Sequence, residues 1–290
     1  MRAAAKRESE ETGLHPGQNL LASKNTSLGQ CLRSGIELFW TSLLRWQTWW
    51  RLGFADFQVA HRRAVIGPLW QVVQVAIWVV GLTLVFRQAL AASAANYMLY
   101  VAIGVVLWNF ISSSITQGTL AFIRYAGLIR DINNPILIYP FRVLTNNLIK
   151  LGVQASIILL VWPTGSVVLQ PAMLLAIPGF ALIILTAFWV IPLLALIGVR
   201  YRDTSHAFQA VMRFLFFATP VFWLPSGLGS RDYIATFNPL AHYLNVVREP
   251  LLGGAIDPLS WIVVISITLG GGAISLVALG RFRREIVFWL

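Results

Sequence analysis

Long apolar runs separated by short polar segments fill most of the chain. Six runs are long and apolar enough to form membrane-spanning helices, at 64–86, 97–120, 136–161, 172–199, 206–224 and 261–279. An α-helix rises about 1.5 Å per residue, so about 20 apolar residues cross the roughly 30 Å of hydrocarbon in a bilayer. The pattern predicts an all-α integral membrane protein with six transmembrane helices, and a transmembrane domain over residues 64–279.

The segment before the first span has a different pattern. Between Ile36 and Phe57, apolar residues recur every three or four positions and charged residues interrupt them. Such a helix cannot span, so we predict an amphipathic helix over 36–63 that lies in the membrane interface; a helix packed on a soluble partner is the alternative. Its tryptophans are expected at headgroup depth, namely Trp40, Trp46, Trp49 and Trp50. Residues 1–35 are polar, and we expect a disordered cytoplasmic tail.

A charged island interrupts the apolar sequence between the second and third spans. Residues 121–135 contain Arg124, Arg130 and Asp131, with a break in the helical pattern at Gly127. We interpret this segment as a loop that leaves the membrane, contacts another molecule and returns. A solvated loop without a partner is the plain alternative.

The segment between the fifth and sixth spans, 225–260, is too long for a simple turn. Asn238 is a suitable helix cap, and Pro239 suits the first helical position because its missing N–H would have no partner there. The helix that follows is amphipathic and too short to cross a bilayer. We therefore predict a re-entrant or surface helical hairpin.

Composition and charge support a membrane protein and orient it. The chain is 57% hydrophobic and 11% charged, against roughly 25% charged in soluble domains. Of the Lys and Arg residues outside the spans, nine precede the first span, two lie in 121–135, two in 200–203 and three in the basic tail 280–290. The opposite loops hold three, so both termini and the 121–135 loop are expected in the cytoplasm and the hairpin outside. The net charge of +11 follows this bias, and no basic face mixed with aromatics stands clear of the spans, so we expect no nucleic-acid partner.

The sequence lacks the residue clusters of an enzyme. All eleven acidic residues lie outside the spans or at their edges, and the four histidines have no ligand spacing, so we expect neither a catalytic site nor a metal site. The single cysteine, Cys31, excludes a disulfide within the chain. No Gly-Lys pair exists, so the chain has no Walker A motif, and energy for any uphill transport must come from another polypeptide. Lys150 lies within the third span, either as a snorkelling or helix-facing side chain or as a substrate contact.

Several short motifs, in this order and spacing, resemble the membrane subunits of bacterial ABC exporters that move O antigen, capsule or teichoic acid. They are HRRAVIGPLW at 61–70, YMLYVAIGVVLWNFISSSI at 97–115, the segments 118–135 and 238–252, RYRD at 200–203 and TPVFW at 219–223. The resemblance covers about residues 36–290, and the amino-terminal extension is longer than the family pattern.

The resemblance implies a homodimer in the bacterial inner membrane, bound to two copies of a separate ATPase that binds ATP and Mg. It implies that the 36–63 helix lies along the inner leaflet and that a coupling helix enters the ATPase, with the residues Arg124, Tyr125, Gly127, Leu128, Arg130 and Asp131. The 225–260 hairpin would be the outer gate, with the residues Asn238, Pro239, Tyr243, Arg248 and Glu249.

A passage for sugars should combine aromatic rings, which stack on C–H faces, with small polar groups that pair with hydroxyls. The candidates are Trp70, Trp78, Tyr97, Trp108, Asn109, Phe110, Ser112, Trp189, Phe222 and Trp223. The polar half of the second span faces other helices or a watery passage, because polar groups are costly against lipid. Membrane proteins enrich Trp and Tyr at both interfaces in any case, so only part of this set is expected to line the passage.

These observations predict the transmembrane subunit of an ATP-driven exporter of a lipid-linked, O-antigen-like polysaccharide. The alternative is a permease of the same architecture that exports a lipid, a drug or another small molecule. A membrane-embedded glycosyltransferase or a passive scaffold is disfavoured, because no acidic pair is present at either surface.

Overall fold

The computed structural model describes residues 27–86, 96–132, 134–165, 167–225 and 233–290, and every regular element in these ranges is helical. In chain order the elements are α3 (Leu28–Leu44), α4 (Trp46–His61), α5 (Leu69–Phe86), α6 (Tyr97–Gly118), α7 (Ala121–Arg124), α8 (Ala126–Asp131), α9 (Ile138–Val161), η3 (Trp162–Thr164), η4 (Pro171–Leu175), α10 (Ala176–Arg200), α11 (Thr204–Ala218), α12 (Tyr233–Thr236), α13 (Pro239–Leu252), α14 (Pro258–Phe282) and α15 (Ile286–Trp289). The predicted all-α class is confirmed for this part of the chain.

Five of the described helices are long and apolar enough to cross a membrane. They are α5, α6, α9 with its η3 extension, α10 with the preceding η4, and α14. The fifth predicted span, 206–224, differs: α11 has 15 residues, or about 22 Å at the helical rise, and ends at Ala218. Thr219 takes an extended conformation, and Pro220 follows it, so the helix stops before it reaches the predicted length.

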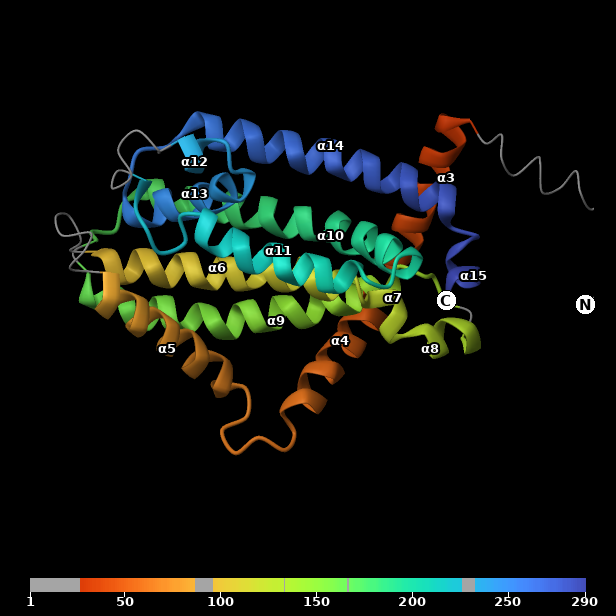
Figure 1. Ribbon diagram of the computed structural model, residues 1–290, viewed down its shortest axis with the longest axis horizontal. Coiled ribbons are helices and arrows are strands. Elements are labelled where there is room, and N and C mark those ends of the chain that lie inside the picture. The colour runs from red at the N-terminus through yellow and green to blue at the C-terminus, as the bar shows by residue number, and fades with distance from the viewer. Residues whose placement is uncertain (1–26, 87–95, 133, 166, 226–232) are drawn as a thin grey trace, which may run out of the picture.

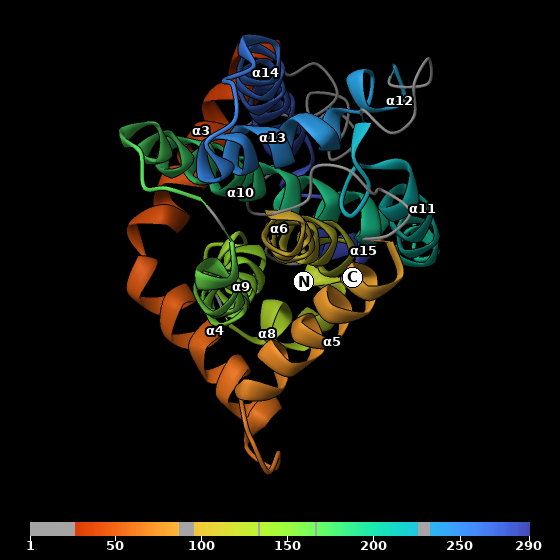
Figure 2. The ribbon, with the colours of Figure 1, turned by 90° about the vertical axis from the view of Figure 1, so that its left-hand side faces the viewer.

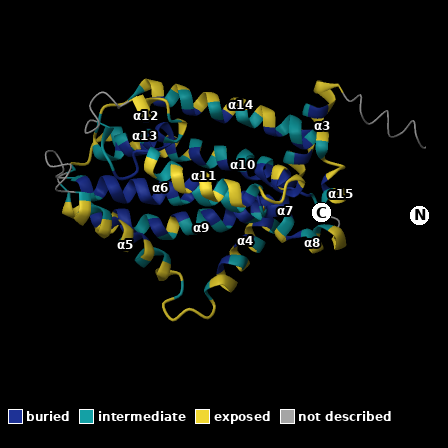
Figure 3. Ribbon diagram, in the orientation of Figure 1, coloured by how far each residue is buried: buried dark blue, intermediate teal, exposed yellow. Residues whose placement is uncertain are grey.

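α6 lies at the centre of the bundle, with α5, α9, α10 and α11 around it, as the view along the helices shows (Figure 2). In the most apolar 18-residue stretch of α6, 67% of the residues are buried, whereas the corresponding share is 11% in α5 and 22% in α14 (Figure 3). A helix that is apolar on all sides is buried by neighbours or faces lipid. Here α6 is enclosed by protein, whereas α5 and α14 form the periphery.

The predicted interfacial helix is two helices, α3 and α4, broken at Arg45. α3 begins at Leu28, directly after a capping box. In this box the side chains of Ser27 and Gln30 each accept a hydrogen bond from the backbone N–H of the other residue. Residues 28–35, predicted as part of the tail, are therefore helical, because the cap starts the helix before the amphipathic pattern begins. Residues 1–26 lie outside the described ranges.

Trp49 differs from the other tryptophans of this segment because it packs against protein instead of facing outward. Its side chain is buried, with ring centroids 5.7 Å from Phe141 and 6.2 Å from Phe188. The other three tryptophans of the segment are exposed, at Trp40, Trp46 and Trp50. Packing of α4 across α9 covers one face of the helix, and Trp49 lies on that face.

The two ends of the bundle carry different structures (Figure 1). α7, α8 and α15 lie at one end, and α12 and α13 lie at the other. The predicted helix cap is confirmed: the Asn238 side chain accepts a hydrogen bond from the Leu240 backbone N–H at 2.9 Å, and Pro239 occupies the first turn of α13. α13 ends at Gly253, which has a φ of 71°, a conformation that favours glycine.

Candidate functional site

The predicted coupling loop is two short helices, α7 and α8, that project at the end of the bundle (Figure 1). Five of its six predicted residues are exposed, namely Arg124, Gly127, Leu128, Arg130 and Asp131. A Cβ added to Gly127 would meet no atom within 4 Å, so this position does not need glycine for packing. Tyr125 differs from the others because it is 8% exposed.

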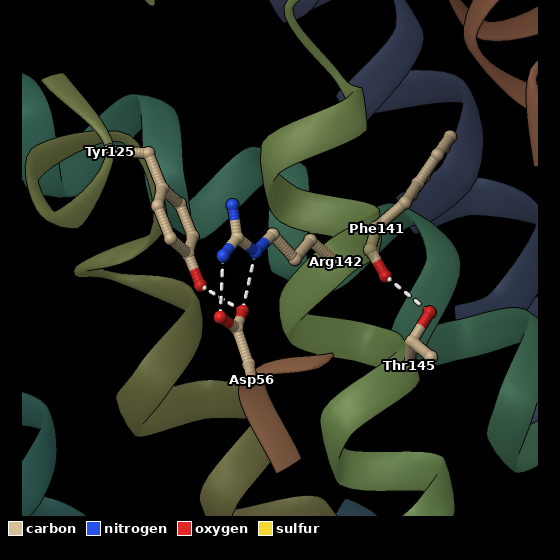
Figure 4. A network of polar contacts seen from close by, with 5 residues as sticks. All are labelled: Asp56, Tyr125, Phe141, Arg142 and Thr145. Carbon is tan, nitrogen blue, oxygen red and sulfur yellow. Dashed lines mark hydrogen bonds and ion pairs between the residues drawn. The ribbon is translucent and has the colours of Figure 1, made fainter. Parts of the chain in front are cut away.

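Tyr125 joins an ion pair that connects three segments of the chain (Figure 4). The Arg142 guanidinium of α9 donates two hydrogen bonds to the Asp56 carboxylate of α4, and the Tyr125 hydroxyl donates a third to the same carboxylate at 2.7 Å. The guanidinium also lies over the Tyr125 ring, 4.3 Å from its centre. Bidentate, charge-assisted bonds of this kind are among the strongest polar contacts in proteins. The arrangement fixes the start of α8 against α4 and α9.

The close approach of α4 to α9 makes this network possible. A Cβ on Gly53 would lie 2.5 Å from Cβ of Thr145, so only glycine permits the two helices to pack this tightly. Asp56 lies one turn after Gly53 and Arg142 nearly one turn before Thr145, which brings their side chains together. The Tyr139 hydroxyl adds a bond to the Leu128 carbonyl oxygen at 3.0 Å.

Burial raises the pKa of Tyr125 to about 12, and its hydrogen bond to Asp56 adds to the increase. The phenol therefore remains a hydrogen-bond donor at all physiological pH values. Sequence reasoning missed Asp56 and Arg142 as a functional pair. The sequence does show a carboxylate within the predicted amphipathic helix and an arginine within a predicted span. Charges at such positions need partners when they are partly buried.

Two cavities flank α6, the first lined mainly by polar side chains and the second presenting mainly apolar surface. The first, of about 550 Å³, lies between α5, α6 and α9, and the second, of about 570 Å³, lies between α5, α6 and α11. Trp78, Asn109 and Ser112 line both cavities, whereas Phe110 lines the first and Trp108 the second. Five of the ten predicted passage residues are thus gathered here.

The remaining passage candidates lie elsewhere. Trp70 is exposed in the first turn of α5, and Trp189 of α10 lines a separate apolar cavity of about 220 Å³ between α6, α10, α13 and α14. Tyr97 donates a hydrogen bond to the Phe222 carbonyl oxygen, and the Trp223 carbonyl accepts one from Tyr100. These contacts hold the start of α6 against the segment after α11, and Tyr97, Phe222 and Trp223 line neither of the two cavities beside α6.

Amide side chains connect the helices around the first cavity. Asn109 of α6 donates to the Gln154 side chain at 3.4 Å, and Gln154 of α9 donates to Gln71 of α5 at 3.0 Å. Asn147 lines the same cavity and is 1% exposed, and in the part of the chain that the structure describes neither polar atom of its amide has a hydrogen-bond partner. Sequence reasoning did not name the amides of Gln71, Asn147 and Gln154. The spacing of Asn147 and Gln154 places both on one face of α9.

The predicted gate residues hold α13 within the bundle. The Asn238 amide donates to Thr219 Oγ1 at 2.8 Å, and the hydroxyl of the buried Tyr243 lies 3.0 Å from the Thr186 hydroxyl. Pro239 lines the apolar cavity, and Glu249 is half-buried near the end of α13.

Arg248 is fully buried, although it counted among the cations of the outer loops in the sequence analysis. Its guanidinium donates to the carbonyl oxygens of Pro220 and Val221 at 2.6 and 3.1 Å and lies 3.8 Å from the Tyr100 ring centre. These carbonyls belong to the segment where α11 has ended, so they have no helical partners. Arg248 supplies those partners.

The described residues contain no group of three His, Cys, Asp or Glu side chains placed to hold a metal ion. The fold and the cavities define a class: a polytopic helical membrane protein with open cavities between the helices of its bundle.

Comparison with known proteins gives the family. The family model of the ABC-2 type transporter matches residues 47–252, so the chain belongs to this family of transport subunits. It is similar to the "O-antigen export system permease protein RfbA" of Myxococcus xanthus, with 25% identity over 79% of this chain and 90% of the relative. The protein of the same name from Klebsiella pneumoniae is 23% identical over 79% of this chain and 88% of the relative.

Proposed function

We propose that this protein is the membrane subunit of an ATP-driven exporter that moves a lipid-linked, O-antigen-like polysaccharide across the bacterial inner membrane. The observation that carries the proposal is the pair of cavities around α6, one lined mainly by polar side chains and one mainly by apolar ones, in which Trp78 and Trp108 lie beside amides and hydroxyls. Sugars need aromatic faces for their C–H groups and polar partners for their hydroxyls. The names of the two relatives support the same substrate class.

A homodimer with two copies of a separate ATPase is the assembly we propose. The sequence contains no Walker A motif, so ATP and Mg would bind to the partner. The exposed, basic surface of α7 and α8 is suited to contact that partner, because arginines on a rigidly held segment can pair with carboxylates of another chain. The weakly buried apolar surface of α5 is suited to lipid or to the second copy.

Six membrane passes fit the direction of the helices in Figure 1. α11 starts at the end that carries α7 and α8, and its chain continues to α12 and α13 at the other end. We propose that α11 and the extended residues after it form the fifth pass together. The termini and α8 would then be cytoplasmic and the α12–α13 hairpin would be the outer gate.

Copurification with the ATPase and export of glycan to the cell surface test this function. Arg130→Glu reverses an exposed charge on α8, and Gly127→Trp places a large side chain where no neighbour lies. Both variants should insert normally and lose export and ATPase binding. Arg51→Glu, an equal charge change on an exposed face of α4, should retain both. Normal export in both α8 variants would refute the coupling role. Export of a lipid or drug, with no glycan at the surface, would refute the substrate class.

A further inference from the structure

Lys150 is a cation inside a membrane-spanning helix, and no anion lies beside it among the described residues. It lies twelve residues after the start of α9 and eleven before its end, and it lines the first polar cavity. The ion pairs in the described part of the chain are Arg33–Glu37 and Arg142–Asp56, and the Lys150 ammonium makes no hydrogen bond there. A charged residue at this depth usually pairs with another group or marks the path of a substrate.

Asn147 provides a second, independent observation at the same cavity. It lies three residues before Lys150 on α9, so both side chains are on one helical face. The side chain is 1% exposed, and among the described residues neither its oxygen nor its nitrogen has a hydrogen-bond partner. Buried polar groups are nearly always hydrogen-bonded, so an unpaired donor and acceptor at the wall of a cavity point to a molecule that binds there once the amide turns toward it.

The two side chains define the chemistry of that molecule. The Lys150 ammonium requires an anion, and the Asn147 nitrogen can donate to an anion's oxygen, whereas the Asn147 oxygen requires a donor such as a hydroxyl. A glycosyl phosphate offers a phosphate and hydroxyls within a few ångströms of one another. Trp78, on the α5 side of the cavity, offers an aromatic face for the sugar ring.

We propose that the cavity between α5, α6 and α9 binds a glycosyl phosphate unit of the transported molecule, with Lys150 contacting the phosphate and Asn147 bridging the phosphate and a sugar hydroxyl. This inference rests on the proposed function for its substrate and deepens it to a named subsite. The phosphate can come from the linkage between the glycan and its lipid, or from a phosphate within the glycan. Both sources present the same chemistry to Lys150.

Calorimetric titration of the full-length permease in lipid nanodiscs tests the subsite, with glucose 1-phosphate as the probe. The wild type should bind it at least tenfold more tightly than methyl glucoside or inorganic phosphate, each of which supplies half of the required groups. Lys150→Met and Asn147→Leu should each weaken binding at least tenfold, whereas Lys150→Arg should retain it within about threefold. Arg51→Gln, which alters an exposed cation on α4 outside the cavity, should bind as the wild type does.

Competition with farnesyl diphosphate separates the two sources. Displacement of glucose 1-phosphate by farnesyl diphosphate at a concentration at least tenfold below that needed with inorganic pyrophosphate assigns the subsite to the lipid linkage, and equal potency of the two competitors assigns it to a phosphate within the glycan. Wild-type affinity in Lys150→Met, or methyl glucoside binding as tightly as glucose 1-phosphate, would overturn the proposal. Because the titration does not depend on export, a permease that exports glycan but fails this test loses only the subsite. One that binds the probe but exports no glycan loses only the proposed function.

Discussion

The contact between Asp56 and Arg142 should contribute more to stability than any exposed ion pair of this protein. Asp56→Ala removes the carboxylate that accepts bonds from Arg142 and Tyr125 (Figure 4). The side chains of Arg142 and Asp56 are 13% and 27% exposed. Removing one partner of a fully buried pair costs about 3–5 kcal/mol, and exposed pairs contribute about 0.2–1 kcal/mol. This pair lies between those limits, so we expect Asp56→Ala to lower the free energy of unfolding by about 2–3 kcal/mol.

A double-mutant cycle isolates the pair from the other effects of each substitution. The free energies of unfolding of the wild type, Asp56→Ala, Arg142→Ala and the double variant would be measured in mixed micelles, by titration with SDS. We expect a coupling energy of about 1.5–2.5 kcal/mol. The Arg33–Glu37 pair of α3 is the matched control, since its side chains are 85% and 58% exposed. Its i, i+4 spacing predicts about 0.3–0.5 kcal/mol.

The result also bears on function, because the pair holds the start of α8 against the bundle. If the proposed coupling role is correct, Asp56→Ala should leave the ATPase of the complex active but reduce glycan export per ATP hydrolysed. A coupling energy no larger than that of the Arg33–Glu37 control would refute the energetic reasoning. Unchanged export per ATP would refute the mechanical role while leaving the energetic one intact.

Four further substitutions test other parts of the structure by the same unfolding titration. The Tyr125 hydroxyl has a pKa of about 12 in the folded state, against about 10 in the unfolded state. Between pH 10 and 12 the free energy of unfolding of the wild type should therefore fall by up to about 1.4 kcal/mol per pH unit relative to that of Tyr125→Phe. Parallel pH dependences of the two free energies would contradict this prediction. Gly198→Ala should lower the free energy of unfolding by at least about 1–3 kcal/mol, because the new Cβ would lie 1.8 Å from the backbone oxygen of Thr119. Gly152→Ala, in open space within α9, should instead stabilise by about 0.5–1 kcal/mol, and equal effects at the two glycines would refute the packing argument. Hydrogen bonding from the Ser260 hydroxyl lowers the pKa of Asp257, the cap of α14. Asp257→Ala should therefore lower the free energy of unfolding by about 0.5–2 kcal/mol at neutral pH and by progressively less as the pH falls below about 4. A cost that is the same at about pH 2 as at neutral pH would contradict the cap assignment.

Local patterns were sufficient for much of the helical layout. Five of the six predicted spans correspond to helices of spanning length, because a run of about 20 apolar residues has few alternatives to a membrane helix. The cap at Asn238 was also readable, since capping depends on residues that are neighbours in sequence. The amphipathic pattern before the first span gave the helices there, but not the break at Arg45 or the start at Leu28.

The sequence by itself determined most of the helical segments, five of the helices that can span a membrane, and the absence of a Walker A motif. Only the tertiary structure decided that Trp49 and Arg248 are buried, that Asp56 meets Arg142 across 86 positions, and that Asn147 has no hydrogen-bond partner among the described residues. The reason is physical. Helix formation and lipid preference are properties of consecutive residues, whereas burial and polar pairing depend on which helices touch, and that depends on close contacts such as the one at Gly53.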